Sequence, residues 1–133
     1  MIHGVGTDIA AVARLAALYD KHGKRALEKL LAPAELEAFA RATDKGRFLA
    51  KRFAAKEAFG KALGIGVAAP ATLPNVAVEH DDLGKPHFAY APELAALMRE
   101  RGLVAHLSIS DEKDYATAFV VVERIAGDVP GCC

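Results

Sequence analysis

One long helical segment, residues 46–63, constrains the fold of this chain more than any other part of its sequence. After Gly46 it continues RFLAKRFAAKEAFGKAL, and Gly64 is placed to end the helix in a left-handed conformation. The chain holds 28 alanines among its 133 residues, so much of its apolar content consists of small side chains that suit close helix packing. We therefore expect other elements to pack closely around this helix.

Segments with strand patterns lie on both sides of this helix in the sequence. Residues 2–8 have the pattern of a short strand in which Gly4 and Gly6 let another backbone come close. Alternating and β-branched residues predict two later hairpins. Their strands are expected at residues 76–79 and 87–90 and at residues 106–110 and 115–123.

Shorter helical patterns fill the rest of the chain. They are predicted at residues 12–18, 27–31, 33–43 and 92–102. A chain of 133 residues fits one domain comfortably and two poorly. The order of elements predicts an α+β fold, in which a mostly antiparallel sheet packs against one long helix and several short ones. This single domain is expected over residues 1–125, followed by a short C-terminal tail at residues 126–133.

The charge distribution narrows the classes of ligand. Lys and Arg together number 17, as do Asp and Glu, and this balance argues against a protein that mainly binds nucleic acid or an anionic membrane. The long helix is locally basic, because residues 45–61 contain six basic residues and a single acid, Glu57. This segment predicts one anionic ligand or patch. The six basic residues are Lys45, Arg47, Lys51, Arg52, Lys56 and Lys61.

Glu57 lies on a face of the predicted helix that carries small side chains and one lysine. At 100° per residue, Ala50, Phe53, Ala54 and Lys61 fall within about 60° of it. One interpretation is an ordinary pair of Glu57 with Lys61, four residues apart, which helix statistics alone favour. The other is that the small neighbours leave room for a ligand, with the carboxylate and the ammonium group both directed at it.

Asp8 ends the first predicted strand and also has two interpretations. It can cap the helix that begins near Val12, because aspartate is a preferred residue just before a helix. Alternatively, Asp8 and Glu57 are hard oxygen donors on separate elements that could together hold Mg²⁺, with water and phosphate oxygens completing the coordination. Lys61 and its basic neighbours would then neutralise the phosphates.

Two motifs resemble those of a known family. Residues 4–9 (GVGTDI) followed by Arg14, and residues 52–64 (RFAAKEAFGKALG), resemble the signature motifs of holo-acyl-carrier-protein synthase, the small bacterial 4′-phosphopantetheinyl transferase. The resemblance spans residues 2–123, nearly the whole chain. Further family segments match in the same order at residues 84–86 (GKP), 106–110 (HLSIS) and 115–118 (YATA).

The resemblance implies the phosphopantetheinyl transferase fold and an enzyme that transfers the 4′-phosphopantetheine arm of coenzyme A to a serine of apo acyl carrier protein. The other product is adenosine 3′,5′-bisphosphate. By the same resemblance, Asp8 and Glu57 bind Mg²⁺, Lys61 contacts the pyrophosphate, and these three residues form the catalytic centre.

The resemblance also implies further contacts and an assembly. The other residues expected to contact coenzyme A are Arg52, Gly64, Pro86, His106, Ser108 and Ser110. The residues expected to meet acidic groups of the carrier protein are Arg14, Lys21, Lys24 and Arg25. The family is typically a homotrimer with each site formed between neighbouring subunits, so the same assembly is expected here.

The sequence leaves alternatives for the roles of Asp111 and His106 and for the function of the protein. Asp111 stands where some family members have histidine, and we interpret it as a cap of the following turn rather than as the general base. His106 either contacts the ligand or is a plain cross-strand neighbour. The rival to an enzyme is a non-catalytic basic module for an acidic protein or nucleic acid, whose binding would fall steeply with salt and ignore Mg²⁺.

The ends of the chain suggest a cellular location. Residues 1–7 do not resemble a secretory signal, and no apolar run approaches the ~18 residues of a membrane span. Cys132 and Cys133 are adjacent at the end of the chain, so we expect no disulfide bond within the domain. We expect a reduced, cytoplasmic protein.

Overall fold

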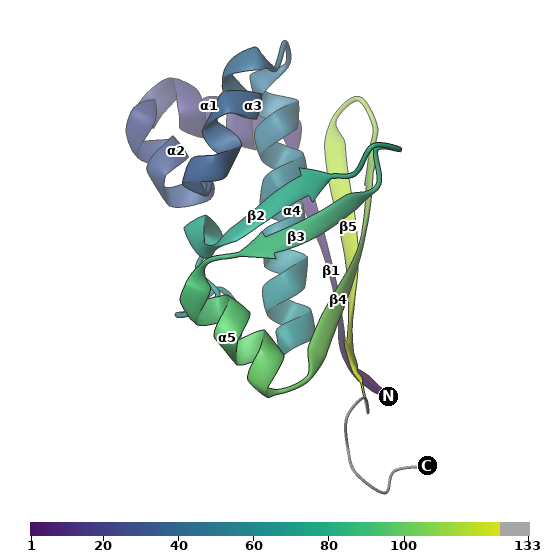
Figure 1. Ribbon diagram of the computed structural model, residues 1–133. Coiled ribbons are helices and arrows are strands. Elements are labelled where there is room, and N and C mark those ends of the chain that lie inside the picture. Colours follow the sequence, from purple (N-terminus) through teal and green to yellow (C-terminus); the bar gives the residue numbers. More distant parts are fainter. Residues whose placement is uncertain (126–133) are drawn as a thin grey trace, which may run out of the picture.

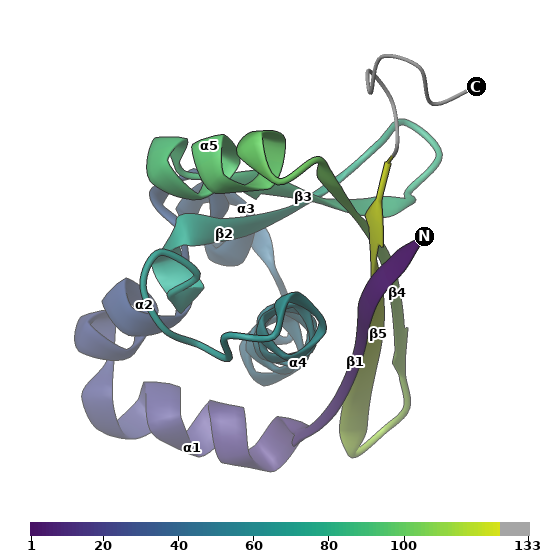
Figure 2. The ribbon, with the colours of Figure 1, turned by 90° about the horizontal axis from the view of Figure 1, so that it is seen from below.

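A long helix lies at the centre of the computed structural model, which describes residues 1–125, and the other elements surround it (Figures 1 and 2). The helices are α1 (Val12–His22), α2 (Lys24–Leu30), α3 (Leu36–Arg41), α4 (Lys45–Leu63) and α5 (Pro92–Glu100). The strands are β1 (Ile2–Ala11), β2 (Val76–His80), β3 (Pro86–Tyr90), β4 (Leu103–Asp111) and β5 (Tyr115–Arg124). Two short 3₁₀ helices are η1 (Pro33–Glu35) and η2 (Leu73–Asn75).

The strands form two antiparallel sheets. A three-stranded sheet has the order β1-β5-β4, and β2 and β3 form a separate hairpin. Viewed along α4, the larger sheet covers one side of the helix, α1 a second, and the β2–β3 hairpin with α5 a third (Figure 2). The predicted α+β class and both hairpins are confirmed. The apolar strand β5 is the central strand of the larger sheet.

Strand β1 packs directly on α4 because two of its inward positions are glycine. A Cβ atom on Gly4 would overlap the carbonyl oxygen of Ala62, and one on Gly6 would overlap that of Ala58. Only glycine therefore permits this approach of a strand backbone to a helix backbone. The close approach that the sequence suggested for the two glycines is thus made to the long helix.

The ends of α4 follow local rules. Asp44 caps its first turn by accepting a hydrogen bond from the backbone N–H of Arg47 at 3.0 Å. Gly64 follows its last turn with φ of 97°, the left-handed conformation that glycine adopts without strain. The predicted helix of residues 46–63 therefore agrees with the observed one to within a residue.

Strand β1 is longer than predicted, which changes the role of Asp8. The strand continues to Ala11, and Ala11 precedes α1 without any side-chain hydrogen bond to the helix. The interpretation of Asp8 as a helix cap was therefore wrong, because the inward-facing residues of β1 continue past it to the buried Ala10.

Two remaining expectations concern membranes and the tail. Within residues 1–125, no helix is both long enough and apolar enough to cross a bilayer. The predicted tail at residues 126–133, with Cys132 and Cys133, lies outside the described residues.

Candidate functional site

Lys61 joins α4 to β1 beside Asp8. Its ammonium group donates a hydrogen bond to the backbone oxygen of Thr7 at 2.9 Å and another to Oδ1 of Asp8 at 3.2 Å. Asp8 faces α4 because it follows Gly4 and Gly6 at the alternate positions that point inward along β1. The fold thus brings together two of the three predicted catalytic residues, which are 53 positions apart in the sequence.

The second carboxylate oxygen of Asp8 lacks a partner. Oδ2 is buried and has no hydrogen-bond donor among residues 1–125. The whole side chain of Asp8 is only 16% exposed. A buried charged oxygen without a donor is costly unless a cation or ordered water supplies the missing contact. This orphaned atom is therefore available to a cation or an ordered water.

The pKa of Glu57 is shifted by its burial and by the charges of Asp8 and Lys61. Burial raises its pKa, the nearby Asp8 carboxylate raises it further, and the charges of Lys61 and Arg14 partly offset both effects. Asp8 and Glu57 are therefore close enough to repel each other, and their repulsion disfavours holding both as anions without a counter-charge. This is the electrostatic condition that a bound divalent cation relieves.

The donor set fits a hard cation such as Mg²⁺. Two carboxylates suit a cation that prefers oxygen ligands and keeps several of its waters. Within residues 1–125 no cluster of three or more His, Cys, Asp or Glu side chains could hold a metal ion, so the protein itself would supply only these two carboxylates. Coordination positions would thus remain for water or for the oxygens of an anionic ligand.

Arg14 lies close to this centre. Its guanidinium group stacks over the ring of Phe53, 5.4 Å from the ring centroid, and its charge lowers the pKa of Glu57. Phe53 lies one turn before Glu57 on α4. Arg14, expected from the sequence to meet a carrier protein, therefore also borders the candidate site at Glu57.

The basic segment of α4 is mostly not a free surface. Lys56 is completely buried, and Arg52 is 7% exposed and lies with Nε 3.0 Å from Oε2 of Glu35. Burial lowers the pKa of Arg52, while the charge of Glu35 opposes that shift. The structure pairs Arg52 with Glu35 inside the fold, and its expected contact with coenzyme A stays a prediction. The rival hypothesis of a broad basic docking helix loses its main support for the same reason.

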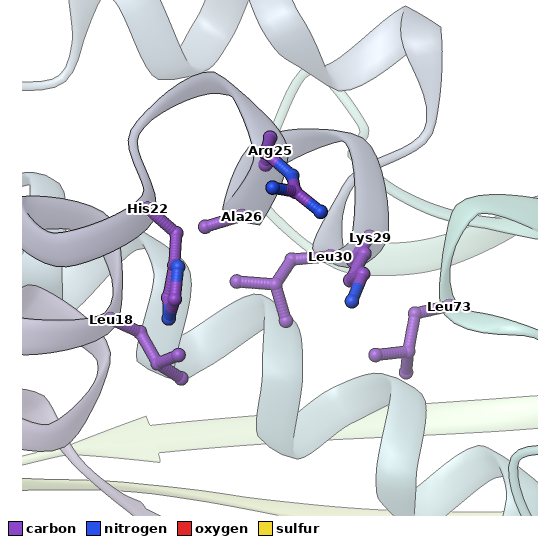
Figure 3. Close-up of a pocket in the computed structure, with 7 residues that line it drawn as sticks. All are labelled: Leu18, His22, Arg25, Ala26, Lys29, Leu30 and Leu73. Carbon is purple, nitrogen blue, oxygen red and sulfur yellow. The ribbon is translucent and has the colours of Figure 1, made fainter.

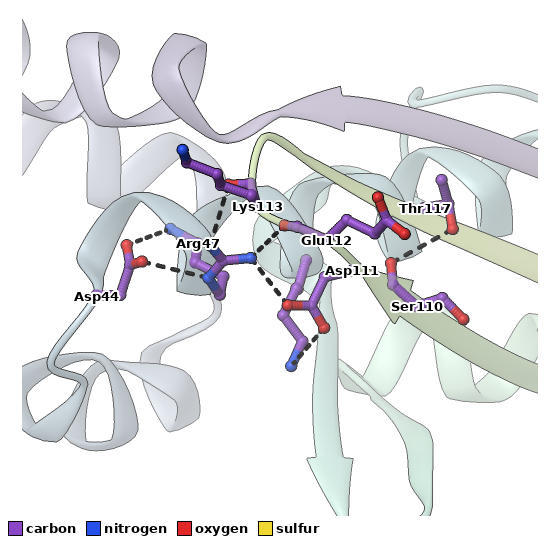
Figure 4. Close-up of polar contacts among 8 residues, drawn as sticks. Asp44, Arg47, Ser110, Asp111, Glu112, Lys113 and Thr117 are labelled. Carbon is purple, nitrogen blue, oxygen red and sulfur yellow. Dashed lines mark hydrogen bonds and ion pairs between the residues drawn. The ribbon is translucent and has the colours of Figure 1, made fainter.

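Arg47 is occupied by the turn between β4 and β5 (Figure 4). Its guanidinium group donates to Oδ2 of Asp111 at 2.9 Å and to the backbone oxygens of Glu112 and Lys113. Asp111 thus forms ion pairs with two residues of α4, a close one with Arg47 and a weaker one, at 3.8 Å, with Lys51. This pairing gives Asp111 a structural role and argues against using it as the general base.

Several expected coenzyme A contacts lie on another surface. His106, Ser108 and Ser110 point away from the core on β4, because the alternate residue Leu107 is buried. His106 pairs with Glu123 on β5, with Nε2 and Oε1 3.0 Å apart. Pro86 begins β3 in the separate hairpin. Within one chain the structure does not gather these residues around Asp8, whereas Gly64 ends the helix that carries Glu57 and Lys61.

A basic-rimmed pocket of about 390 Å³ lies between α1, α2 and η2 (Figure 3). The expected carrier contact Arg25 lines it, whereas Lys21 and Lys24 lie beside it at the end of α1 and the start of α2. Sequence reasoning missed its other polar lining residues, His22 and Lys29, since only the turn at Gly23 brings the two helices together. The lining residues are Leu18, His22, Arg25, Ala26, Lys29, Leu30 and Leu73.

The fold and the site agree with a family comparison. A family model described as the 4′-phosphopantetheinyl transferase superfamily matches residues 4–120, which include Asp8, Glu57 and Lys61. This chain therefore belongs to the 4′-phosphopantetheinyl transferase superfamily.

Its relatives within that superfamily are holo-acyl-carrier-protein synthases. The chain is 61% identical to that enzyme from Dechloromonas aromatica over 93% of its own length and 99% of the relative. The crystal structure of the Neisseria meningitidis enzyme matches with a TM-score of 0.89 at 45% identity, covering 92% of this chain and 99% of that one. A Bacillus anthracis holo-acyl-carrier-protein synthase in complex with coenzyme A (3′,5′-ADP) matches with a TM-score of 0.78 at 33% identity, covering 94% and 99%.

Proposed function

We propose that this protein is a holo-acyl-carrier-protein synthase, which transfers the 4′-phosphopantetheine arm of coenzyme A to a serine hydroxyl of apo acyl carrier protein. Adenosine 3′,5′-bisphosphate leaves in the same step. The proposal is carried by one observation, in a chain whose relatives bear this name: Lys61 pairs with Asp8, which has a buried carboxylate oxygen without a partner, and the charges of both residues act on Glu57.

The reaction balances around one phosphorus atom. The serine oxygen forms a bond to the phosphorus that carries the pantetheine arm, the phosphoanhydride bond to the leaving phosphate breaks, and the serine proton is released. The protein contributes mainly by positioning and by neutralising charge, as in other phosphoryl transfers. Lys61 neutralises charge on the departing phosphate.

Glu57 is the best-placed proton acceptor among the residues of the site. Its raised pKa makes it a better base than an ordinary glutamate, and it has two oxygens, so one can accept the serine proton while the other binds a cation. Asp8 and Glu57 would hold Mg²⁺, which when bound acts as a Lewis acid toward the phosphate oxygens. Metal dependence is part of this proposal.

The assembly and location also belong to the proposal. The outer face of the larger sheet carries exposed apolar side chains, with Val5 58%, Ile9 61% and Phe119 49% exposed. His106, Ser108 and Ser110 share that face. A homotrimer in which this face meets a neighbouring subunit would bring these polar residues to a site formed between subunits. The expected cytoplasmic location stays a prediction that cell fractionation can test.

The carrier protein is proposed to dock on α1 and α2. Arg14, Lys21, Lys24 and Arg25 present positive charge there, which suits an acidic partner. Arg14→Ala should raise the KM for the carrier and lessen its dependence on ionic strength, while the KM for coenzyme A stays nearly unchanged. An equal rise in both KM values would assign Arg14 to coenzyme A binding instead.

The decisive experiment uses the intact protein with coenzyme A, Mg²⁺ and several apo carrier proteins. Mass spectrometry of the carrier should show the added mass of one phosphopantetheine arm, and the reaction should stop when EDTA removes the cation. Unmodified carriers in every case would reject the proposal. Modification that persists in EDTA would reject only its metal dependence.

A further inference from the structure

Lys56 is a charged group buried in the core directly beside a catalytic residue. Its side chain is 0% exposed, and its ammonium group donates to the backbone oxygen of Leu30 at 2.8 Å, to that of Leu73 at 3.1 Å and to Oε1 of Glu35. These three acceptors belong to α2, η2 and η1. An ammonium group has three N–H donors, so each of them is used on a different element.

Glu35 completes the network from the opposite side. One of its oxygens also accepts the backbone N–H of Ala32 at 2.8 Å, and the other accepts that of Val78 on β2 at 3.0 Å. Arg52 adds an ion pair to the second oxygen. Glu35 is 2% exposed, and the hydrogen bonds of Lys56 and Glu35 are directional, whereas Arg52 adds charge without a hydrogen bond from its Nε. The hydrogen bonds thus join α4 to four neighbouring segments in one arrangement.

The contact of α4 with β1 has fewer directional restraints, and none of them is fully buried: Lys61 donates to Thr7 and Asp8, and Nε2 of His3 lies 3.1 Å from the backbone oxygen of Leu63. There the carbonyl oxygen of Ala58 lies against Gly6, and that of Ala62 lies against Gly4. At these positions the strand presents backbone atoms and no side chains to the helix. This contact fixes how closely the helix approaches the strand, because a Cβ atom would not fit. Interlocking side chains, which resist sliding along a helix axis or rotation about it, are missing from these glycine positions.

We infer that the Lys56–Glu35 pair sets the axial and rotational position of α4, and thereby the position of Glu57 relative to Asp8. Lys56 is a positioning residue, one place before Glu57, that acts without touching a substrate. The consequence for catalysis rests on the proposed function, whereas the geometric claim does not. Stability alone does not account for the pair, since buried ion pairs can often be replaced by apolar residues of similar volume without loss.

The test compares Lys56→Met with the double variant Lys56→Met/Glu35→Gln. The double variant removes both charges of the pair and keeps one acceptor oxygen at residue 35, for the N–H group of Ala32 or of Val78, which use different carboxylate oxygens in the wild type. It should therefore disturb folding less than the single variant, which leaves Glu35 charged without Lys56. The matched control is Lys113→Met, which removes an exposed lysine from the turn after β4. Crystal structures of the variants and Mn²⁺ titrations followed by electron paramagnetic resonance supply the two measurements.

We expect the separation of the Asp8 and Glu57 carboxylates to change by about 1 Å in the double variant, a displacement large enough to impair a catalytic site. Mn²⁺ affinity should fall roughly 10–100-fold, as for other groups that orient metal ligands. Lys113→Met should keep the wild-type affinity and geometry.

The outcomes separate this inference from the proposed function. Variant crystal structures in which Glu57 keeps its position relative to Asp8 would overturn the inference, whatever the activity. If the wild-type protein modifies none of the carriers, the proposed function fails, and the crystallographic comparison still decides whether Lys56 positions Glu57. A displaced Glu57 with weakened Mn²⁺ binding supports the inference.

Discussion

At the scale of single residues, the site depends on two carboxylates that share one small space. Asp8 and Glu57 repel each other, and Lys61 compensates only one oxygen of Asp8. The protein therefore holds an electrostatic cost at this place that a cation would remove. This arrangement makes the ionisation of Glu57 a direct reporter of the site.

The pH dependence of stability should reveal that cost. The pKa of Glu57 is raised above its ordinary value of 4.5 in the folded protein, so its favourable contribution is complete below that value and is lost as the pH rises through the raised pKa. Urea unfolding in EDTA should show this loss, and added Mg²⁺ should reduce it because the cation favours the ionised form.

Two variants calibrate this measurement. Glu57→Gln should remove the loss of stability, because the side chain no longer titrates. Asp8→Asn should reduce it, because the repelling charge is gone. An unchanged pH profile in Asp8→Asn would show that the two carboxylates do not interact.

A second prediction at this scale concerns Gly6. Its substitution by alanine places a Cβ atom on the carbonyl oxygen of Ala58, so β1 and α4 must move apart. Gly6→Ala should lower the free energy of unfolding by about 1–3 kcal/mol, as other overpacked sites do, and should weaken Mn²⁺ binding. Thr7→Ala, on the opposite face of the same strand, is the control and should change stability little. Equal stability of both variants would contradict the close approach.

At the scale of elements, the chain uses side chains of α4 to fasten distant segments to the central helix. Lys56 reaches η1, α2 and η2, and Arg47 reaches the turn between β4 and β5. Both were expected from the sequence to contribute to an anionic ligand site. Their structural use explains why the basic residues of this helix do not all face one ligand site.

Arg47→Ala should loosen the turn between β4 and β5. The guanidinium group makes the shorter links of this turn to α4, through Asp111 and two backbone oxygens, and the pair of Lys51 with Asp111 at 3.8 Å is weaker (Figure 4). Hydrogen exchange should become faster at residues 112–115 and remain unchanged in the β2–β3 hairpin. Arg41→Ala, which removes an exposed pair with Glu37, should leave both regions as they are. Unchanged exchange in Arg47→Ala would show that the strand pairing alone holds the turn.

At the scale of the whole molecule, the larger sheet has one covered face and one exposed face. α4 covers the inner face, whereas Val5, Ile9 and Phe119 lie exposed on the outer one. A soluble monomer seldom exposes a contiguous apolar patch without a use for it. The proposed trimer would cover this face and bring His106, Ser108 and Ser110 of one copy to the site of another.

Phe119→Arg should therefore disrupt the assembly. Light scattering after size-exclusion chromatography should give the mass of a trimer for the wild type and of a monomer for the variant, and transfer activity should fall with it. Leu83→Arg is the control, because Leu83 is 95% exposed in the turn between β2 and β3 and should tolerate a charge. A trimeric Phe119→Arg variant would place the interface elsewhere.

The sequence alone was enough to predict which elements form and to indicate Asp8 and Glu57 as the candidate site. The extent of α4, its glycine end and the two hairpins follow from periodicity and from residues close in the chain, and the motifs around Asp8 and Glu57 indicated the family. These features are local, so neighbouring residues are enough to predict them.

Only the tertiary structure decided what most charged side chains of α4 do. Lys56 meets Glu35 across 21 positions, and Arg47 meets Asp111 across 64. A helical pattern shows the direction of a side chain around its own axis, but it does not show which distant segment lies there. Whether a lysine binds a ligand or a buried glutamate depends on that segment, because burial makes the nearest opposite charge the dominant partner.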